Sequence, residues 1–293
     1  MASGIAALAA AATVLAGAGA AGAAGAVGTS PAAASGSLYF VRGVNIMVVP
    51  VGGGTAHKVT KAGTDSVTGM TIASGKVFWV TVTGRHDTLS FASKNGGSAH
   101  VLVRNLNTPR GLVSADGWLF WVDENAIGRV HPNGTGLSRK FIKLPQEVGG
   151  GVADGLATDG HHLFFSRCLG HEIGRVDLTG AHKHLSFIKL SRKACPQGLG
   201  VGNSHVYWAD LSGFVGRATL TGHSANGSWL NIHAAGQGPF NVAADNAHVY
   251  WDWGGAAGSP VHVGRATVSG TGLNKNFLTG QGAFALTSSG ANS

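Results

Sequence analysis

Helical periodicity is absent from the chain after residue 35, and charged residues are scarce, at 12% of 293 residues. Without apolar residues at helical spacing, an α-helical domain is excluded. The low charge fits sheets that are buried on both faces, and the 48 glycines fit many turns. The composition therefore predicts an all-β fold.

No run of five or more cations occurs, although the formal net charge is +8. The 21 Lys and Arg residues are spread along the whole chain, and no recognised nucleic-acid motif accompanies them. A nucleic-acid partner is therefore not expected. A weak attraction to an anionic cell-envelope polymer is the predicted consequence of the charge.

The N-terminal segment lacks Lys and Arg, since the first cation is Arg42. Residues 5–27 are almost wholly Ala, Gly, Val and Leu, and Pro31 with the alanines that follow it resembles the cleavage region of a secretory signal peptide. Weakly apolar alanines and interrupting glycines argue against a membrane span. We expect residues 1–35 to be a signal peptide or a disordered Ala/Gly-rich leader, and residues 36–293 to form one secreted or cell-envelope domain.

Pairs of large aromatic residues recur at nearly constant spacing, with 39, 42, 44, 43 and 43 residues between their first members. The pairs are Tyr39-Phe40, Phe78-Trp79, Phe120-Trp121, Phe164-Phe165, Tyr207-Trp208 and Tyr250-Trp251. Each copy holds four short segments separated by turn residues; in the third copy we expect strands at 111–115, 118–122, 127–131 and 138–144. A period of forty-odd residues predicts a β-propeller of four-stranded antiparallel blades.

The two ends of the chain each contain part of a blade. Residues 282–287 have the pattern of an innermost strand, whereas residues 38–41 begin at the second strand of a copy. Pairing the C-terminal strand with the N-terminal blade completes that blade and leaves no long exposed sheet edge. We therefore predict a six-bladed propeller, closed in this way.

Some polar residues repeat with the blades, which indicates a structural role. An Ile/Val-Gly-Arg signature recurs in the third strand, with its arginines at Arg129, Arg175, Arg217 and Arg265. These arginines are expected to stack on aromatic rings or to pair with carboxylates, and the aromatic pairs are expected to fill the spaces between blades. His161, His162 and His205 are expected in exposed turns on the opposite face, without an acidic or Cys partner at metal-ligand spacing.

Over about residues 38–287 the repeat resembles the low-density lipoprotein receptor class B, or YWTD, repeat. The segment most similar to the YWTD tetrad is residues 207–210 (YWAD), followed by residues 120–123 (FWVD). Residues 39–42 and 164–167 carry Arg in place of the final Asp, and Tyr250-Trp251-Asp252 lacks the third residue of the tetrad. The resemblance implies a six-bladed propeller in which the tetrad Asp is largely structural. No cysteine-rich receptor modules flank the repeat, so the resemblance implies architecture and no receptor function.

The two cysteines fall in loops of neighbouring blades on one face of the predicted propeller. Cys168 lies between a second and a third strand, and Cys195 lies ahead of the next inner strand. In an exported protein a Cys168–Cys195 disulfide is expected, and closing a loop of 27 residues would stabilise the fold by roughly 3 kcal/mol. The alternative is two unpaired cysteines that pack as small hydrophobic residues.

Side chains that break the repeat gather at the upper mouth of the predicted channel. The residues aligned ahead of the inner strands are Thr68, Arg110, Asp154, Gln197 and Phe240. Loops on the same face add Arg85, His86, Asp87, Asp123, Glu124, Arg167, His171, Glu172, Asp210, Asp252 and Trp253. This face combines charged, hydrogen-bonding and aromatic groups on rigid strands. Arg110 and Asp154 predict either a salt bridge across the channel or a pair of ligand contacts.

The favoured function is that of a monomeric, secreted binding propeller without catalysis or cofactor. Its ligand is expected to be a protein, a peptide or a carbohydrate such as a cell-envelope polysaccharide, and Trp253 is expected to stack on a sugar or to insert into a partner. The predicted ligand-binding residues are Arg110, Asp154, Gln197, His171, Glu172 and Trp253.

Two other functions remain open from the sequence. One is a lyase or lactonase similar to streptogramin lyases or gluconolactonases, with a divalent metal ion in the channel. Asp154 is the sole carboxylate at the aligned mouth positions, with Gln197 and Asn241 as neutral ligands, so this ligand set is incomplete; His171 and Glu172 would be the general base and a metal ligand. The other is a purely structural or surface-layer role.

Overall fold

A computed structural model describes residues 36–63, 66–84, 86–123, 125–145, 154–202, 204–232, 238–254, 261–278 and 287–288. Its regular elements are all strands. The predicted leader, residues 1–35, lies outside these ranges. Within them, no helix is long and apolar enough to span a membrane.

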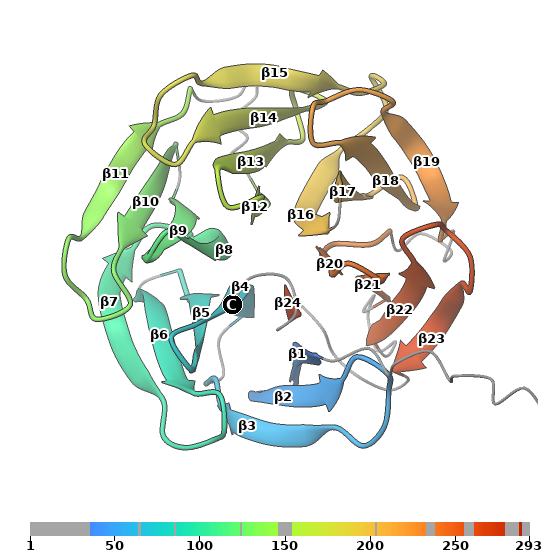
Figure 1. Cartoon of the computed structure of the whole chain (residues 1–293). Helices are drawn as coiled ribbons and strands as arrows, with labels where there is room; N and C mark the ends of the chain where they lie inside the picture. The colour runs from blue at the N-terminus through green and yellow to red at the C-terminus, as the bar shows by residue number, and fades with distance from the viewer. Residues whose placement is uncertain are drawn as a thin grey trace, which may run out of the picture. The chain divides into compact units, whose positions relative to one another are not determined.

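The strands form six four-stranded antiparallel sheets, which are the blades of a β-propeller (Figure 1). From the inside outward, blade 1 contains β24 (Thr287–Ser288), β1 (Ser37–Arg42), β2 (Asn45–Pro50) and β3 (His57–Lys61), and blade 2 contains β4 (Ser66–Ala73), β5 (Lys76–Val82), β6 (Asp87–Ser93) and β7 (His100–Leu106). Blade 3 contains β8 (Arg110–Ala115), β9 (Trp118–Asp123), β10 (Ala126–Val130) and β11 (Ser138–Lys143), and blade 4 contains β12 (Leu156–Thr158), β13 (His162–Arg167), β14 (Glu172–Asp177) and β15 (His184–Lys189). Blade 5 contains β16 (Pro196–Gly202), β17 (His205–Asp210), β18 (Phe214–Thr219) and β19 (Asn226–Asn231), and blade 6 contains β20 (Val242–Ala244), β21 (His248–Gly254), β22 (Val261–Thr267) and β23 (Asn274–Leu278).

Blade 1 is completed by the C-terminal strand, as predicted. Strand β24 pairs antiparallel with β1, through Leu38 opposite Ser288 and Tyr39 opposite Thr287. Most of the predicted closing segment, residues 282–286, lies outside the described residues. The strands of the third copy match their predicted positions to within one or two residues. We call the end of the propeller at which the second strands end and the inner strands begin the top face.

The aromatic pairs fill the spaces between blades, which confirms their predicted role. Successive residues of a strand point to opposite faces of the sheet, so each pair serves two interfaces. The first member of one pair packs with the second member of the next, as Phe120 does with Phe165 and Phe164 with Trp208. Tyr250 and Phe40 share a cluster in the same way, so the aromatic packing continues across the closure between blades 6 and 1.

The recurrent Ile/Val-Gly-Arg signature has a packing explanation. A Cβ atom at the glycine would collide with the ring of the second aromatic, as at Gly128 with Trp121. The arginine stacks on aromatic rings, which confirms its structural role. The ring-to-guanidinium distances are 4.0 Å and 3.6 Å for Arg129 over Trp118 and Phe141, 4.1 Å for Arg175 over Phe187, 4.6 Å for Arg217 over Trp229 and 4.2 Å for Arg265 over Phe277.

Other cations join the outer strands of neighbouring blades. Arg139 Nη2 donates to the carbonyl oxygen of Arg104 at 2.9 Å, and Lys183 Nζ donates to that of Lys143 at 2.8 Å. Lys275 Nζ makes the corresponding bond to a carbonyl just beyond β19, at 2.7 Å. Several of the cations behind the +8 net charge therefore hold blades together, and the charge alone is weak evidence for a ligand.

The inner strands approach one another closely at glycines. A Cβ atom at Gly69 would lie 2.7 Å from the backbone of Gly111 and of Leu112 in the next blade. A Cβ at Gly198 would lie 2.7 Å from the Cα atom of Asn241. Glycine at these positions lets the six inner strands close around a narrow centre.

Replacing Gly69 with alanine should therefore lower the free energy of unfolding by about 1–3 kcal/mol, the usual cost of overpacking. Urea denaturation measures the loss. Gly227→Ala is the matched control, because its Cβ would meet nothing within 4 Å, and it should change stability by less than about 0.5 kcal/mol. Equal stability of the two variants would mean that the inner strands can separate without cost.

Candidate functional site

The residues aligned ahead of the inner strands meet at the top of the channel and connect neighbouring blades. Thr68 Oγ1 donates to the carbonyl oxygen of Pro109 at 2.5 Å. Arg110 Nε lies 3.4 Å from Asp154 Oδ1, and Gln197 Nε2 donates to Asp154 Oδ2 at 3.4 Å. The structure thus brings three of the six predicted ligand-binding residues together, in a chain of contacts from blade 3 to blade 5.

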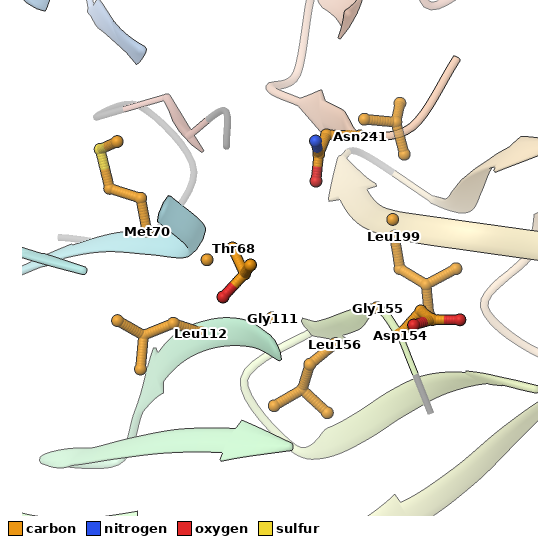
Figure 2. Close-up of a pocket in the computed structure, with 12 residues that line it drawn as sticks. Thr68, Met70, Gly111, Leu112, Asp154, Gly155, Leu156, Leu199 and Asn241 are labelled. Carbon is orange, nitrogen blue, oxygen red and sulfur yellow. The ribbon is translucent and has the colours of Figure 1, made fainter. Parts of the chain in front are cut away.

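The space enclosed by the inner strands is small. The cavity at the mouth has a volume of about 40 Å³, and the backbone around its glycines forms much of its wall. Figure 2 shows Thr68, Asp154 and Asn241 at different points around it, Thr68 within β4, Asp154 ahead of β12 and Asn241 ahead of β20, while Met70, Leu112 and Leu156 extend away from it. A volume of this size holds about three water molecules. The part of the cavity that the described residues enclose is therefore too small for a sugar or lactone ring.

Asp154 is the charged group most affected by this setting. Its side chain is 20% exposed, and burial raises the pKa of its carboxyl group. The guanidinium of Arg110 and the hydrogen bond from Gln197 act in the opposite direction and only partly compensate. The Arg110 side chain is 40% exposed, so the ion pair is reachable from solvent on the top face.

The donor set at the mouth does not fit a divalent metal ion. Among the residues that the structure describes, Asp154 is the sole carboxylate that lines the cavity, and it pairs with the cation Arg110. A hard cation needs several converging oxygen ligands, and an adjacent guanidinium repels it. Over all the ranges that the structure describes, no group of three or more His, Cys, Asp or Glu side chains is placed to hold a metal.

His171 and Glu172 support the top loops of blade 4. His171 is half-buried, and its Nδ1 donates to the carbonyl oxygen of Ala194 at 2.6 Å. Glu172 is buried, and its two carboxylate oxygens accept hydrogen bonds from Arg167 and Ser186. Both predicted site residues therefore have structural contacts of their own, and neither reaches the cavity lining.

Trp253 is engaged within blade 6. Its Nε1 donates to the carbonyl oxygen of Lys275 at 2.7 Å, and its ring stacks on His262 at a centroid distance of 4.7 Å. The indole also packs against the core between blades 5 and 6. The structure thus places Trp253 apart from the Arg110–Asp154 pair, and residues 255–260 of its loop lie outside the described ranges.

The tetrad carboxylates are structural, as the repeat resemblance implied. Asp123 Oδ1 accepts the backbone N–H of Asn107 at 2.8 Å. Asp210 Oδ1 accepts the backbone N–H and the hydroxyl of Ser212 at 2.9 and 2.7 Å. Asp87, also on this face, accepts the N–H of Thr108 at 2.7 Å. Arg85 and Glu124 lie outside the described residues.

The prediction that Tyr250-Trp251-Asp252 lacks the third tetrad residue is wrong. Trp251 pairs with Gly264 and Asp252 with Val263, as Trp208 pairs with Gly216 and Ala209 with Val215, so Asp252 itself occupies the third position. There it accepts the backbone N–H groups of Asn241 at 2.6 Å and of Phe240 at 3.1 Å. Burial raises the pKa of Asp252 to about 7.

The predicted disulfide is present. Cys168 and Cys195 are bonded, and they connect the β13–β14 loop of blade 4 to the segment that enters β16 of blade 5. Gln197 Nε2 lies 3.2 Å from Cys195 Sγ, next to its contact with Asp154. The disulfide therefore borders the polar residues of the mouth.

On the opposite face, the sequence offered His161 and His162 no acidic or Cys partner at metal-ligand spacing, and the structure places Asp159 beside His162. His162 Nδ1 donates to Asp159 Oδ2 at 2.9 Å, and His182 Nδ1 donates to Asp177 Oδ2 at 2.6 Å. A cleft of about 580 Å³ opens here, lined in part by His161, His162 and Asp177. The sequence does contain a signal for this contact, which is an Asp three residues before a His. The same spacing recurs at Asp245 and His248. It marks a turn in which the carboxylate accepts backbone N–H groups.

Comparison with known proteins identifies the fold alone. No family model matches the chain, and neither does any curated protein sequence. Among solved structures, the nidogen propeller of a nidogen/laminin complex matches with a TM-score of 0.67 at 14% identity, over 88% of this chain and 100% of that one.

Two enzymes have similar structures. The PQQ-bound aldose sugar dehydrogenase of Streptomyces coelicolor matches with a TM-score of 0.56 at 15% identity, over 78% of this chain and 89% of its own. A gluconolactonase of Xanthomonas campestris matches with a TM-score of 0.56 at 18% identity, over 73% of this chain and 76% of its own. Because propellers of one architecture serve unrelated functions, these likenesses assign no activity.

Proposed function

We propose that this protein is a secreted or cell-envelope propeller that binds a protein, peptide or carbohydrate ligand through its top face, without catalysis. The Arg110–Asp154 ion pair carries the proposal, because it stands at the mouth of a cavity whose described part is too small for a substrate ring. Because Arg110 is 40% exposed, the polar groups at the mouth can act at the surface. Surface recognition by rigid, non-repeating side chains is the function that this arrangement supports best.

Three further observations support the proposal. The Cys168–Cys195 disulfide suits an oxidising compartment outside the cytosol. The YWTD-like tetrads, with structural carboxylates at Asp123 and Asp210, suit a YWTD-type propeller. The structurally similar nidogen propeller was crystallised in a complex with laminin, so an architecture of this kind supports protein binding.

Replacing Arg110 and Asp154 together with alanine should abolish ligand binding and leave the fold intact. An exposed ion pair contributes about 0–1 kcal/mol to stability, so the double variant should melt close to the wild type. Ligands selected on the immobilised full chain, from a random-peptide phage library and from a glycan array, supply the binding assay. Unchanged affinity for every selected ligand in the double variant would overturn the assignment of the mouth.

The second candidate function is a metal-dependent lactonase or lyase. The structural likeness to a gluconolactonase favours it, whereas the donor set around Asp154 opposes it. Incubation of the full chain with gluconolactone and Ca²⁺, Zn²⁺ or Mn²⁺ separates the two functions. Turnover that disappears in Asp154→Ala would establish the enzyme and overturn the binding proposal; no turnover above the rate in buffer is the expected result.

A further inference from the structure

Large apolar side chains are exposed on the top face of three consecutive blades. Leu169 lies in the β13–β14 loop, Leu211 in the β17–β18 loop and Phe240 just ahead of β20, and their exposed fractions are 46%, 41% and 45%. One exposed leucine needs no explanation. Three on adjacent blades of one face form a surface of the kind that partners cover.

The backbone connects these three residues into one rigid feature, which we call the apolar ridge (Leu169, Leu211 and Phe240). The disulfide joins Cys168, next to Leu169, to Cys195. The N–H of Leu211 donates to the carbonyl oxygen of Cys195 at 3.4 Å. On the far side, a Cβ atom at Gly238 would lie 2.5 Å from the carbonyl oxygen of Leu211, so the segment leading to Phe240 packs directly on Leu211.

The ridge is flanked by positive charge. Lys189, Arg192 and Lys193 are exposed at the end of β15 and in the segment that leads to Cys195. The described carboxylates around the ridge are buried, as Glu172 and Asp210 are, or paired with a cation, as Asp154 is. A partner that lies on the ridge therefore meets apolar side chains and cations, with almost no exposed negative charge from these described residues.

We propose that the apolar ridge docks a polypeptide segment that carries large apolar side chains next to Asp or Glu. The proposal rests on the binding function proposed above and extends the contact from the channel mouth to the rim of blades 4 to 6. Apolar anchors supply affinity, while the surrounding cations steer and orient an acidic partner. The disulfide holds the ridge in place, which lowers the entropic cost of binding.

The chemistry favours a polypeptide over an anionic polysaccharide. A polysaccharide would be held mainly by the cations, with Phe240 as the one aromatic of the ridge that could stack on a sugar, because the two leucine side chains form no hydrogen bonds with its hydroxyl groups. An acidic peptide with large apolar residues would use both features of the surface. Removal of the ridge and reversal of its flanking charge are therefore expected to weaken binding independently.

The test uses peptides selected from a random-peptide phage library on the immobilised full chain. Selected sequences should be enriched in Asp or Glu together with Leu, Phe or Trp. Leu169→Ser, Leu211→Ser and Phe240→Ser in combination should weaken their binding by about tenfold or more, and so should Lys189→Glu, Arg192→Glu and Lys193→Glu in combination. Leu137 and Leu273, 41% and 44% exposed in loops of the opposite face, are the matched apolar controls; their serine variants should bind as the wild type does.

Three outcomes would overturn the proposal in distinguishable ways. The first outcome is that the selected peptides bind the ridge variant as tightly as the wild type but bind the Arg110→Ala, Asp154→Ala variant more weakly. This result would support the proposed binding function and reject the ridge as the docking surface. The second outcome concerns polygalacturonate. If its binding depends on salt, disappears in the charge-reversal variant and is unchanged in the ridge variant, the ligand is a polysaccharide and not a polypeptide. Selected peptides without acidic residues would reject the charge argument. Melting curves of each variant verify that the fold is retained.

Discussion

Replacing Cys168 and Cys195 together with alanine is expected to lower the free energy of unfolding by roughly 3 kcal/mol. The disulfide closes a loop of 27 residues, and a cross-link of this length removes that much conformational entropy from the unfolded chain. The bond also joins the top loops of blades 4 and 5, whose interface is held as well by apolar packing and by the hydrogen bond from Gln197 to Asp154. Urea denaturation without reductant measures the loss.

Reduction of the wild type with dithiothreitol provides the control. It should lower the unfolding midpoint by about as much as the double substitution does, because both remove the same cross-link. The same reductant should leave the midpoint of the Cys168→Ala, Cys195→Ala variant unchanged. A double variant as stable as the oxidised wild type would show that blades 4 and 5 are held fully by their packing.

The fold could be predicted because its determinants are local and repeat. Each aromatic pair fills two interfaces, so selection for packing preserves it in every blade, and its period reports the blade count directly. The incomplete ends predicted that a C-terminal strand at residues 282–287 pairs with the N-terminal blade, since a half-blade has one obvious partner; among the described residues, Thr287 and Ser288 make this pairing. Topology placed both cysteine loops on the same face, so the disulfide was expected in an exported protein, with two unpaired cysteines as the alternative; the structure has the disulfide.

The site was harder to predict because it depends on contacts between distant parts of the chain. Trp253 fits a ligand-binding aromatic in the sequence, yet the Lys275 carbonyl and the His262 ring already engage it. Asp252 was misaligned by one position, because only the strand register shows that it stands where Ala209 stands in blade 5. The apolar ridge has no sequence signature, since exposure of Leu169 or Leu211 is a property of the folded surface.

Asp252 is also expected to cause the most distinctive pH dependence of stability in this protein. Asp252 is 1% exposed, and burial raises its pKa to about 7 although the side chain of Asn241 and two backbone N–H groups donate to the carboxylate. In the unfolded chain the pKa of Asp is about 4. Between about pH 4 and pH 7 the native state therefore binds more protons than the unfolded state, so this group adds stability as the pH falls.

Asp252→Asn removes the titration and keeps the size and an acceptor oxygen. The difference in unfolding free energy should therefore shift in favour of the wild type as the pH is lowered from about 7 towards 4, with a slope of up to ~1.4 kcal/mol per pH unit. Denaturation of both proteins across this range measures it. Parallel pH profiles would show that Asp252 stays ionised in the native state.

Asp177→Asn is the control of opposite sign. The hydrogen bond from His182 holds the pKa of Asp177 below its usual value, so this carboxylate contributes stability above the unfolded pKa of about 4 and loses it as the pH falls further. Acidification from about pH 7 to 4 should therefore move the Asp252 comparison in favour of the wild type, and acidification below about pH 4 should move the Asp177 comparison against it. Opposite trends in two carboxylate variants of one protein exclude a general effect of net charge, because both substitutions remove one negative charge.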